Sequence, residues 1–310
     1  MKKILLFGGT GLVGKNFLQC KFADRYEINS PTKQEVNLLD ESRTVEFIQD
    51  SHPDLIINAA GKVGGIKANI CNDLDFYLDN LSIGTNILLG ARKSKVTNVL
   101  NLGSSCMYPA NTNKKLKETD LMKGELEKTN EGYALAKLAV SKLAEYMSNQ
   151  EPDLNYKTII PCNLFGKFDN FDPFTSHMIP SVISKVHNAK LNDELNVEMW
   201  GDGTVKREFM YIEDFIDFLY FSIKNFKRLP QYINVGTQTD YSIKHYYKII
   251  MKVIGFKGNI VKNTAQPTGM LRKKVDTTLL TEFGWKSKIT LEQGIKETYN
   301  FYLKEIHEKI

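Results

Sequence analysis

Short apolar runs alternate with helix-like stretches through the first half of the chain. The run 4–7 (ILLF) leads into glycines and then into a helical pattern over 12–18. A short, fully apolar run is typical of a parallel strand that is buried on both faces. The same pattern predicts further strands at 55–59, 96–102 and 156–160, and helices at 81–92 and 131–147. Alternation of this kind predicts an α/β fold with a doubly wound parallel sheet of the Rossmann type.

The pattern changes after about residue 161, where segments rich in aromatic residues and loops replace the regular alternation. Two more helices are predicted at 212–224 and 242–254, and the run 232–236 (YINVG) indicates one more buried strand. Because we expect that strand to return to the first sheet, the second domain is expected to be discontinuous. The expected division is a Rossmann domain at 1–165 with a returning segment near 205–240, and a smaller α/β domain at 166–204 and 241–310.

Composition and charge narrow the class of protein. The chain has 310 residues, of which 42% are hydrophobic and 25% charged, as in ordinary globular proteins. The net charge of +5 comes from scattered lysines and arginines, so we expect no nucleic-acid partner, although an anionic small substrate would fit. No apolar stretch approaches the roughly 20 residues of a membrane helix. The four cysteines lie far apart with no metal-binding or disulfide spacing, so we expect a cytoplasmic protein without a metal or a membrane partner.

A glycine-rich segment, GGTGLVG, lies between the first predicted strand and the first predicted helix. Glycines at such a place allow a tight turn, a close approach of backbone to a pyrophosphate, and close helix–strand packing. The helix N-terminus then offers unpaired N–H groups and the positive end of its dipole to the phosphates. We therefore predict that a dinucleotide is bound by Gly8, Gly9, Thr10, Gly11, Leu12, Val13 and Gly14.

The end of the second predicted strand bears on the choice between NAD and NADP. An NAD site usually has a carboxylate there to bind the ribose 2′-hydroxyl, whereas this chain has the neutral residues 28–30 followed by Lys33. A lysine would favour a 2′-phosphate, so NADP(H) is predicted and the domain at 1–165 is expected to be NADP-binding. The role of Lys33 as an ordinary surface lysine stays open, because Glu27 and Glu35 lie nearby.

Three side chains form a candidate site for hydride-transfer chemistry. Tyr133 and Lys137 are four residues apart, which puts them on one face of the helix predicted there. A nearby ammonium is expected to lower the pKa of the tyrosine, which could then exchange a proton with a carbonyl or carbinol oxygen. Ser104 follows the strand 96–102, at the end of a strand where ligands bind in such sheets, and could bond the same oxygen.

Taken together, the glycine loop, the GSS segment and the YxxxK pair resemble the extended short-chain dehydrogenase/reductase superfamily. More closely, the chain is similar to the GDP-L-fucose synthase family, the GDP-4-keto-6-deoxymannose 3,5-epimerase/4-reductases. The similarity spans essentially the whole chain and is carried by the segments 58–69 (NAAGKVGGIKAN), 102–109 (LGSSCMYP), 126–137, 161–166 (PCNLFG), 169–180 (DNFDPFTSHMIP) and 200–214, with the helical stretch after 284–285.

The resemblance implies roles for further residues. Cys106 and His177 would carry out the epimerisation, and Tyr133 with NADPH the reduction at C4. The additional contacts to the cofactor would come from Ala59, Ala60, Leu102, Gly103, Ser105, Pro161, Asn163 and Leu164. The contacts to GDP would come from Lys185, Trp200, Arg207, Arg272 and Lys273. A homodimer formed through the helix that carries Tyr133, serving a surface polysaccharide such as a capsule, is also implied.

Two departures from the family pattern lie on the substrate side. The chain has PTGMLRK at 267–273 where the family usually has PDGTPRK, and Lys185 where it usually has an arginine. An alternative is therefore a dedicated C4 reductase of a GDP-4-keto heptose or 6-deoxy-heptose, with epimerisation by a separate enzyme. A third hypothesis is a nucleotide-binding regulator without chemistry, against which the Ser104, Tyr133 and Lys137 set argues.

Overall fold

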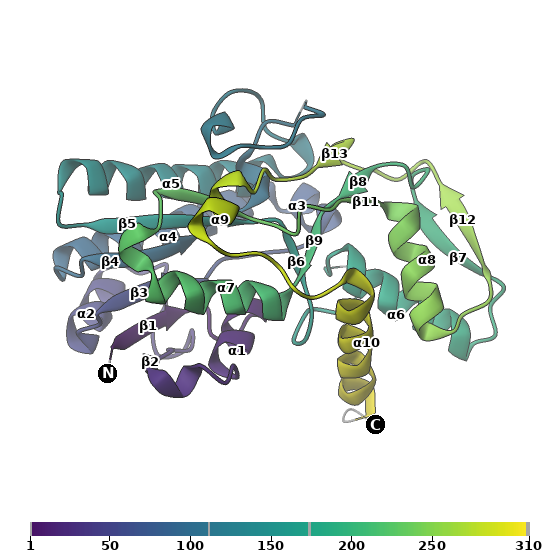
Figure 1. Cartoon of the computed structure of the whole chain (residues 1–310), viewed down its shortest axis with the longest axis horizontal. Helices are drawn as coiled ribbons and strands as arrows, with labels where there is room; N and C mark the ends of the chain where they lie inside the picture. The colour runs from purple at the N-terminus through teal and green to yellow at the C-terminus, as the bar shows by residue number, and fades with distance from the viewer. Residues whose placement is uncertain (1, 111, 173–174, 308–310) are drawn as a thin grey trace.

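The chain folds around a six-stranded parallel sheet, seen in a computed structural model that describes residues 2–110, 112–172 and 175–307 (Figure 1). Neighbouring strands all run parallel, which confirms the predicted doubly wound sheet. The late run YINVG provides one edge strand, as expected. In spatial order the strands are β10 (Tyr232–Val235), β5 (Asn155–Pro161), β4 (Asn98–Leu102), β3 (Leu55–Asn58), β1 (Lys3–Phe7) and β2 (Glu27–Asn29).

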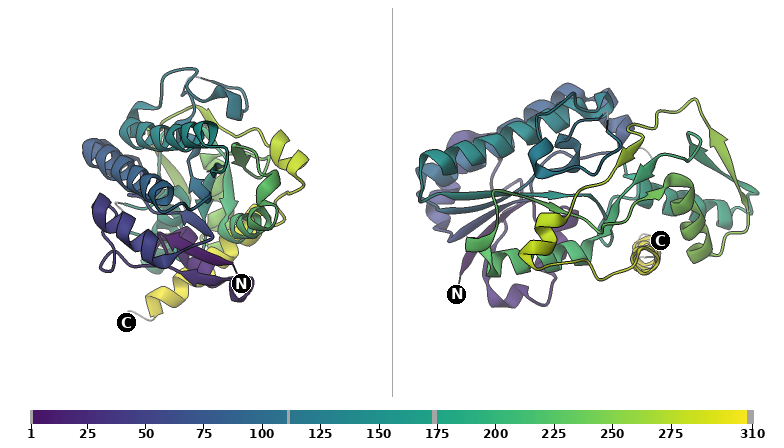
Figure 2. Two further views of the ribbon diagram at one scale, coloured as in Figure 1. Left: turned by 90° about the vertical axis from the view of Figure 1, so that its left-hand side faces the viewer. Right: turned by 45° about the horizontal axis from the view of Figure 1, so that its top comes forward.

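Helices cover both faces of this sheet (Figures 1 and 2). Along β1, Leu5 and Phe7 join one hydrophobic core, whereas Ile4 and Leu6 join the other, because successive strand side chains point to opposite faces. One face is covered by α2 (Glu41–Ser51), α4 (Asp73–Lys93) and α5 (Glu131–Gln150), which pack side by side. The other face is covered by α1 (Leu12–Leu18) and α7 (Ile212–Lys224), with α9 (Thr278–Phe283) beside β10.

A second, smaller part of the molecule extends from the sheet, to the right in Figure 1. It begins where β5 runs directly into β6, so it starts at the carboxyl edge of the large sheet. Its helices are α6 (Met178–Leu191), α8 (Ile243–Ile254) and α10 (Leu291–His307). Its strand pairs are β6 (Asn163–Phe165) with β9 (Phe209–Tyr211), and β7 (Asn196–Trp200) with β12 (Asn259–Asn263). Its three-stranded sheet has the order β11 (Tyr241–Ser242), β8 (Lys206–Arg207), β13 (Arg272–Lys273).

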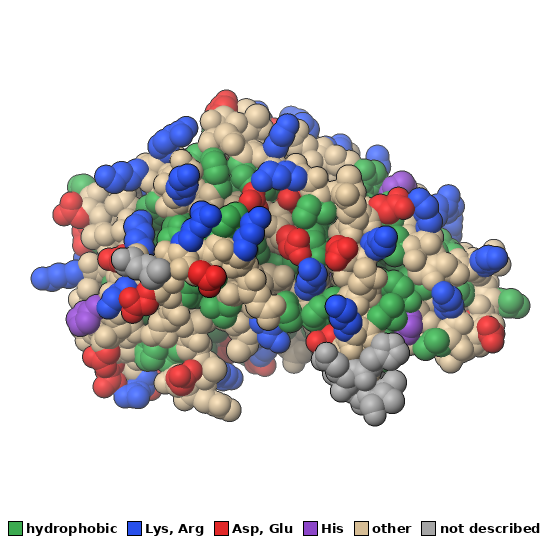
Figure 3. All heavy atoms as spheres, turned by 60° about the horizontal axis from the view of Figure 1, so that its bottom comes forward, with side chains coloured by type: hydrophobic (Ala, Val, Ile, Leu, Met, Phe, Trp, Pro, Cys, Tyr) green, Lys and Arg blue, Asp and Glu red, His purple; other side chains and the backbone are tan. Residues whose placement is uncertain are grey.

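The connections after β1, β3, β4 and β5 therefore meet at one edge of the sheet, next to the smaller part. The short helix α3 (Ile66–Cys71) belongs to the connection after β3. Of the segment 169–180, Pro173 and Phe174 lie outside the described residues. Among the described helices, none has both the length and the apolar character needed to cross a membrane. Basic and acidic side chains are interspersed over the face shown in Figure 3.

Candidate active site

The glycine loop after β1 packs its backbone closely against two neighbouring segments. Gly8 has φ of +91°, in the left-handed region, and a Cβ on it would lie 2.5 Å from the carbonyl carbon of Ala59. A Cβ on Gly14 would lie 2.2 Å from the carbonyl oxygen of Gly8. The N-cap of α1 is Gly11, which has no side chain to bond the first N–H groups of the helix. Bare backbone and uncapped N–H groups together form a cradle that fits a pyrophosphate.

The acidic residues near β2 already have partners in the protein. The carboxylate of Glu35 accepts hydrogen bonds from the backbone N–H of Thr32 at 2.7 Å and from its hydroxyl at 2.8 Å, and these bonds lower its pKa. Glu27 is the first residue of β2 and so lies at the end of this strand away from Lys33, and its carboxylate is 3.9 Å from the ammonium of Lys3. Lys33 is exposed in the same connection as Glu35. This arrangement weakens the argument for an NAD-type carboxylate, although contact of Lys33 with a phosphate stays a prediction.

Ser104 and Cys106 are brought together by the turn that follows β4. Ser104 is extended and caps a short 3₁₀ turn, Ser105–Met107, with its hydroxyl oxygen accepting the backbone N–H of Cys106 at 3.2 Å. The Ser104 hydroxyl also interacts with the Cys106 thiol and with the phenol of Tyr133. Each interaction favours the charged form of its partner, although burial outweighs this effect on the pKa of Tyr133. One hydroxyl thus links the two groups that the sequence assigned to different chemical steps.

Tyr133 and Lys137 lie in the first two turns of α5, as their spacing predicted. The Lys137 ammonium is buried and donates a hydrogen bond to the carbonyl oxygen of Leu102 at 3.1 Å, at the end of β4. The ring of Tyr133 meets Phe76 of α4 edge to face, with 6.5 Å between ring centroids. The structure therefore places both side chains at the carboxyl edge of the sheet, beside Ser104.

The expectation that Lys137 lowers the pKa of Tyr133 is wrong for this structure. Burial raises the pKa of the Tyr133 phenol well above its ordinary value, and the negative charge of Cys106 adds to the effect. Burial also lowers the pKa of Lys137 to about 8. The cause is desolvation, which disfavours both charged forms and is only partly offset at Tyr133 by Ser104. Tyr133 is consequently a protonated acid at neutral pH.

Cys106 has a polar environment that stabilises its thiolate. The Lys273 ammonium lies 3.2 Å from its sulfur, and the side-chain amide of Asn130 lies 3.1 Å from it. Burial of Cys106 raises its pKa, but the charge of Lys273 and the hydrogen bonds from Ser104, Lys273 and Asn130 outweigh it, so that the net pKa is lowered. The thiol is therefore not an inert buried cysteine.

His177 precedes the first residue of α6 and serves as its N-cap. Its side chain is solvent-accessible, although protein atoms crowd the imidazole. That crowding, followed by the positive charge of Lys273, lowers the pKa of His177. Lys273 thus acts on both residues to which the sequence assigned the epimerisation.

The remaining predicted cofactor contacts lie along the same edge of the sheet. Ala59 and Ala60 follow β3, and Leu102, Gly103 and Ser105 end or follow β4. Pro161 ends β5, and Asn163 and Leu164 form part of β6. The side-chain amide of Asn163 donates to the backbone carbonyl of Glu208 at 2.7 Å, so its orientation is fixed. The structure brings these residues to one edge, while their contact with a dinucleotide stays a prediction.

Two predicted substrate contacts lie on or beside β7, away from the catalytic turn. The Lys185 ammonium donates to the backbone carbonyl of Glu198 at 2.9 Å, and the indole of Trp200 donates to the carboxylate of the same glutamate at 3.1 Å. Asn263 of β12 donates to the other carboxylate oxygen at 2.6 Å. Glu198 thus organises this end of the smaller part.

The two arginines among the predicted substrate contacts, Arg207 and Arg272, bind other groups of the protein. The guanidinium of Arg207 donates to the backbone carbonyls of Met270 at 2.6 Å and Thr268 at 2.9 Å, inside the segment that departs from the family pattern. Arg272 forms a bidentate ion pair with Asp240, at 2.6 and 2.9 Å. Contact of either arginine with GDP stays a prediction.

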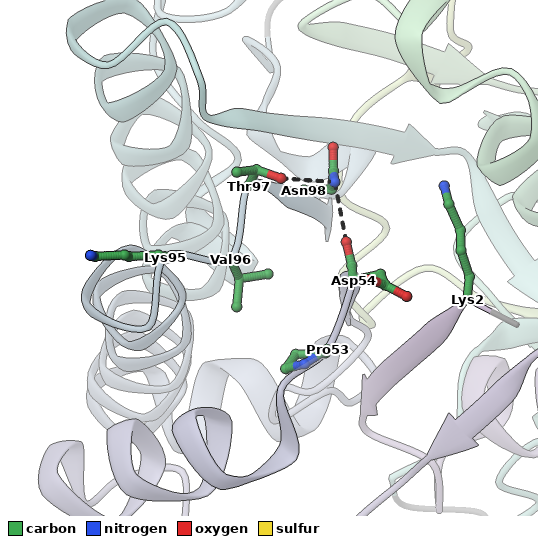
Figure 4. A pocket seen from close by; sticks show the side chains of 7 residues that line it. All are labelled: Lys2, Pro53, Asp54, Lys95, Val96, Thr97 and Asn98. Carbon is green, nitrogen blue, oxygen red and sulfur yellow. Dashed lines mark hydrogen bonds between the residues drawn. The ribbon is translucent and has the colours of Figure 1, made fainter.

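A hollow at the opposite edge of the sheet contains none of these residues (Figure 4). It lies where β1, β3 and β4 begin, and Asn98 donates there to the backbone carbonyl of Asp54 at 3.1 Å. It is lined by Lys2, Pro53, Asp54, Lys95, Val96, Thr97 and Asn98. Ligands of doubly wound sheets bind at the carboxyl ends of the strands, so the candidate site is the edge with Ser104.

Comparison with known proteins agrees with this geometry. The profile of the NAD dependent epimerase/dehydratase family matches residues 4–236. The chain belongs to this family. Within the epimerase/dehydratase family, a GDP-L-colitose synthase of Yersinia pseudotuberculosis is 48% identical over 303 residues, 98% of each chain. A GDP-L-fucose synthase of Escherichia coli is 36% identical over 312 residues, covering 98% of this chain and 97% of its own, which confirms the narrower resemblance.

Solved structures of GDP-sugar reductases superpose over almost the whole chain. A GDP-6-OMe-4-keto-L-xylo-heptose reductase from Campylobacter jejuni gives a TM-score of 0.92 at 29% identity, covering 98% of each chain. A GDP-mannoheptose C4 reductase from the same organism, solved with NADP bound, gives 0.87 at 30% identity, covering 97% of this chain and 98% of its own.

Three side chains of this epimerase/dehydratase site were not found from the sequence. Asn130 contacts the Cys106 sulfur, the buried Glu208 accepts the N–H of Val275 just after β13, and Asp240 pairs with Arg272. For Asn130, its position three residues before Tyr133 was the only feature of the sequence that could have indicated a place at the site. The partners of Glu208 and Asp240 are distant in the sequence, so no local pattern reveals them.

Proposed function

We propose that this chain uses NADPH to reduce C4 of a GDP-linked 4-keto-6-deoxy sugar, and that it also epimerises the sugar at C3 and C5. The observation that carries the proposal is the Ser104 hydroxyl, which accepts the backbone N–H of Cys106 and interacts with both the Cys106 thiol and the Tyr133 phenol. A carbon base and a proton donor for the ketone oxygen are thereby held in one site. Relatives named GDP-L-colitose synthase and GDP-L-fucose synthase support the same class of substrate.

The epimerisation uses the acidity of carbon next to a ketone. The carbonyl at C4 acidifies the C–H bonds at C3 and C5, so a base can remove a proton to leave an enolate. Cys106, with its lowered pKa, provides a thiolate for this step. A proton returned on the opposite face inverts the carbon, and His177 is the residue to which we assign that exchange.

The reduction uses groups of α5 and of the turn after β4. NADPH supplies the hydride to C4 when it is bound at the glycine loop. The raised pKa of Tyr133 keeps its phenol protonated, so the phenol can give a proton to the oxygen of C4 while the Ser104 hydroxyl orients that oxygen. Lys137, fixed on the carbonyl of Leu102, lies where it can hold the nicotinamide ribose.

Two groups of residues would hold the ligands. The cofactor NADP(H) would lie along the glycine loop with its 2′-phosphate at Lys33. The GDP moiety would lie over the smaller part, near Lys185, Trp200, Arg207, Arg272 and Lys273. Arginine suits a diphosphate because its planar fork binds two oxygens at once, whereas Lys185 supplies the charge alone.

A second candidate is a dedicated C4 reductase of a GDP-4-keto heptose, with epimerisation by another enzyme. The structural similarity to a GDP-6-OMe-4-keto-L-xylo-heptose reductase favours it. The segment 267–273 is consistent with it, because Leu271 is exposed and Met270 replaces a polar family residue on the substrate side.

Exchange with heavy water separates the two candidates. Incubation with GDP-4-keto-6-deoxymannose in D2O without NADPH is expected to introduce deuterium at C3 and C5, read by NMR. Tyr133→Phe should keep this exchange and lose NADPH oxidation by about 10² to 10⁴-fold, whereas Cys106→Ser should lose the exchange. Absence of exchange with the wild-type enzyme, together with reduction of a heptose ketone, would establish the second candidate instead.

The assembly proposed for the protein is a cytoplasmic homodimer that serves a surface polysaccharide such as a capsule. Apolar side chains are exposed on the two adjacent helices α4 and α5: Leu74 is 68% exposed, Leu135 44% and Tyr146 57%. Exposed apolar side chains on these two neighbouring helices are consistent with a protein contact there. We also propose that the nucleotide and substrate domains divide as the sequence predicts, with β10 returning to the first.

A further inference from the structure

Lys273 reaches the catalytic turn from a distant part of the chain. It ends β13, which pairs in parallel with β8, and its ammonium lies 3.2 Å from the sulfur of Cys106. The family resemblance implies that Lys273 contacts GDP. In the structure its ammonium is directed at the thiol.

The segment around Lys273 is fixed on both sides. Its backbone carbonyl accepts the N–H of Glu208 at 3.3 Å, and the buried carboxylate of Glu208 accepts the N–H of Val275 at 3.0 Å. The preceding residue, Arg272, forms an ion pair with Asp240, and this pair also holds β13 in place. The position of the ammonium is therefore set by the fold and does not depend on a flexible side chain alone.

We propose that Lys273 is the positioning residue that keeps Cys106 as a thiolate for the epimerisation. The thiol proton passes to solvent and Lys273 remains an ammonium. The thiolate then takes a proton from the substrate carbon, and the electron pair of that C–H bond moves into the enolate. The role in catalysis rests on the proposed function, whereas the ion pair between Lys273 and Cys106 does not.

Other charged or titratable groups also face Cys106. They are Tyr133 of α5, which stays neutral at working pH, and Arg207 of β8, whose guanidinium holds the carbonyls of the loop 268–270. His177 interacts with Lys273. Among these described groups only Lys273 brings a full charge within hydrogen-bonding distance of the sulfur. Removal of this charge should therefore change the ionisation of Cys106 more than removal of any other.

Alkylation of Cys106 in the full-length protein tests the ion pair directly. The rate of reaction with iodoacetamide, followed by peptide mass spectrometry across pH, reports the thiolate fraction of each cysteine separately. In Lys273→Met the midpoint for Cys106 should rise by about one pH unit or more, which slows the reaction at pH 7 about tenfold. Lys273→Arg should restore the wild-type profile, and Lys273→Gln provides a second removal of the charge.

Lys274→Met is the matched control. The neighbouring Lys274 lies 3.5 Å from Asp240 and has no contact with Cys106 among the described interactions, so its loss should leave the midpoint unchanged. An unchanged midpoint in both Lys273→Met and Lys273→Gln, or an equal shift in Lys274→Met, would overturn the proposal.

Turnover separates this role from binding of the diphosphate. At saturating substrate, Lys273→Met should slow deuterium exchange at C3 and C5 about tenfold, and should slow this exchange more than it slows reduction of an already epimerised ketone. A rise in KM for the reduction with unchanged exchange would show a diphosphate ligand and overturn the proposal. If the proposed function itself failed, the wild type would reduce no GDP-4-keto sugar, yet the alkylation shift would remain.

Discussion

The phenol of Tyr133 and the ammonium of Lys137 lie one helical turn apart, yet burial moves their pKa values in opposite directions. Both shifts favour the neutral form, because charge is costly away from water. In the proposed reaction Tyr133 would therefore act as an acid, which suits the reduction of a ketone. The YxxxK spacing predicted where the two residues lie but not their protonation, because protonation depends on the packing around them.

Lys137 gives a stability prediction whose sign follows from its pKa of about 8. An unfolded lysine has a pKa near 10.4, so between pH 8 and pH 10.5 the unfolded chain binds more protons and the free energy of unfolding rises with pH. Relative to Lys137→Met, the wild type should gain on the order of 1–3 kcal/mol across this range. Urea unfolding at several pH values measures it, and a constant difference between the two proteins would contradict it.

The candidate catalytic residues could be named from the sequence because each belongs to a motif, whereas the residues that contact them could not. Ser104, Tyr133 and Lys137 follow from spacing, and Cys106 and His177 from the family resemblance. Asn130 and Glu208 act through contacts that exist only when the chain has folded. A residue whose chemistry depends on distant backbone groups leaves no local pattern in the sequence.

Glu208 joins three segments of the chain, namely its own segment between β8 and β9 and the connections that follow β10 and β13. Its carboxylate accepts backbone N–H groups from Thr237 at 2.7 Å, Gln238 at 2.9 Å and Val275 at 3.0 Å. The side chain is fully buried between β8 and β9. It thereby links the connection after β10 to the strand that carries Lys273.

Removal of this carboxylate should loosen these segments. Glu208→Ala leaves the buried N–H of Val275 and the part-buried N–H groups of Thr237 and Gln238 without their acceptor, and is expected to lower the free energy of unfolding by about 2–4 kcal/mol. It should also raise the alkylation midpoint of Cys106, because Lys273 loses its anchor.

The control is Glu213→Ala, which removes an exposed carboxylate that pairs with Lys167. It should cost less than about 1 kcal/mol in the same urea titration. Equal losses in the two variants would show that Glu208 does not act as an anchor.

The regular elements were predictable to the extent that they carry periodic apolar patterns. The helices expected at 12–18 and 212–224 match α1 and α7. The helix expected at 81–92 is longer in the structure, where α4 begins at Asp73. Its first turns were not predicted from the sequence, because apolar residues there, such as Leu74 and Leu78, are exposed and do not follow the pattern of a buried helix face. The two-residue strands β8, β11 and β13 are too short to show any period, so the sheet that holds Lys273 was not foreseen.

On the scale of the whole molecule, the parallel sheet collects its loops at one edge, and the smaller part faces that edge. The doubly wound topology and its late returning strand were predictable from strand–helix alternation. The relative placement of β13 and β4 was not, because it depends on how the smaller part packs against the sheet.

The proposed dimer gives a prediction at this scale. The double variant Leu78→Asp, Leu135→Asp places charges on α4 and α5 and should convert a two-chain particle into a single chain, as measured by sedimentation equilibrium. Leu191→Asp, at the exposed end of α6, changes a similar side chain elsewhere and should leave the dimer intact. A single-chain mass for the unaltered protein would refute the proposed assembly.

Lys273 is the last residue of the divergent segment 267–273, and this position has an evolutionary consequence. The residues assigned to hydride transfer all precede position 138, so redox chemistry can be inherited unchanged while the segment diversifies. Insertions or deletions in that segment would, however, shift Lys273 away from Cys106. Selection for a new sugar would therefore also affect cleavage of the carbon–hydrogen bond in the epimerisation. Lineages in which the sugar preference has changed are expected to have lost or altered the epimerisation.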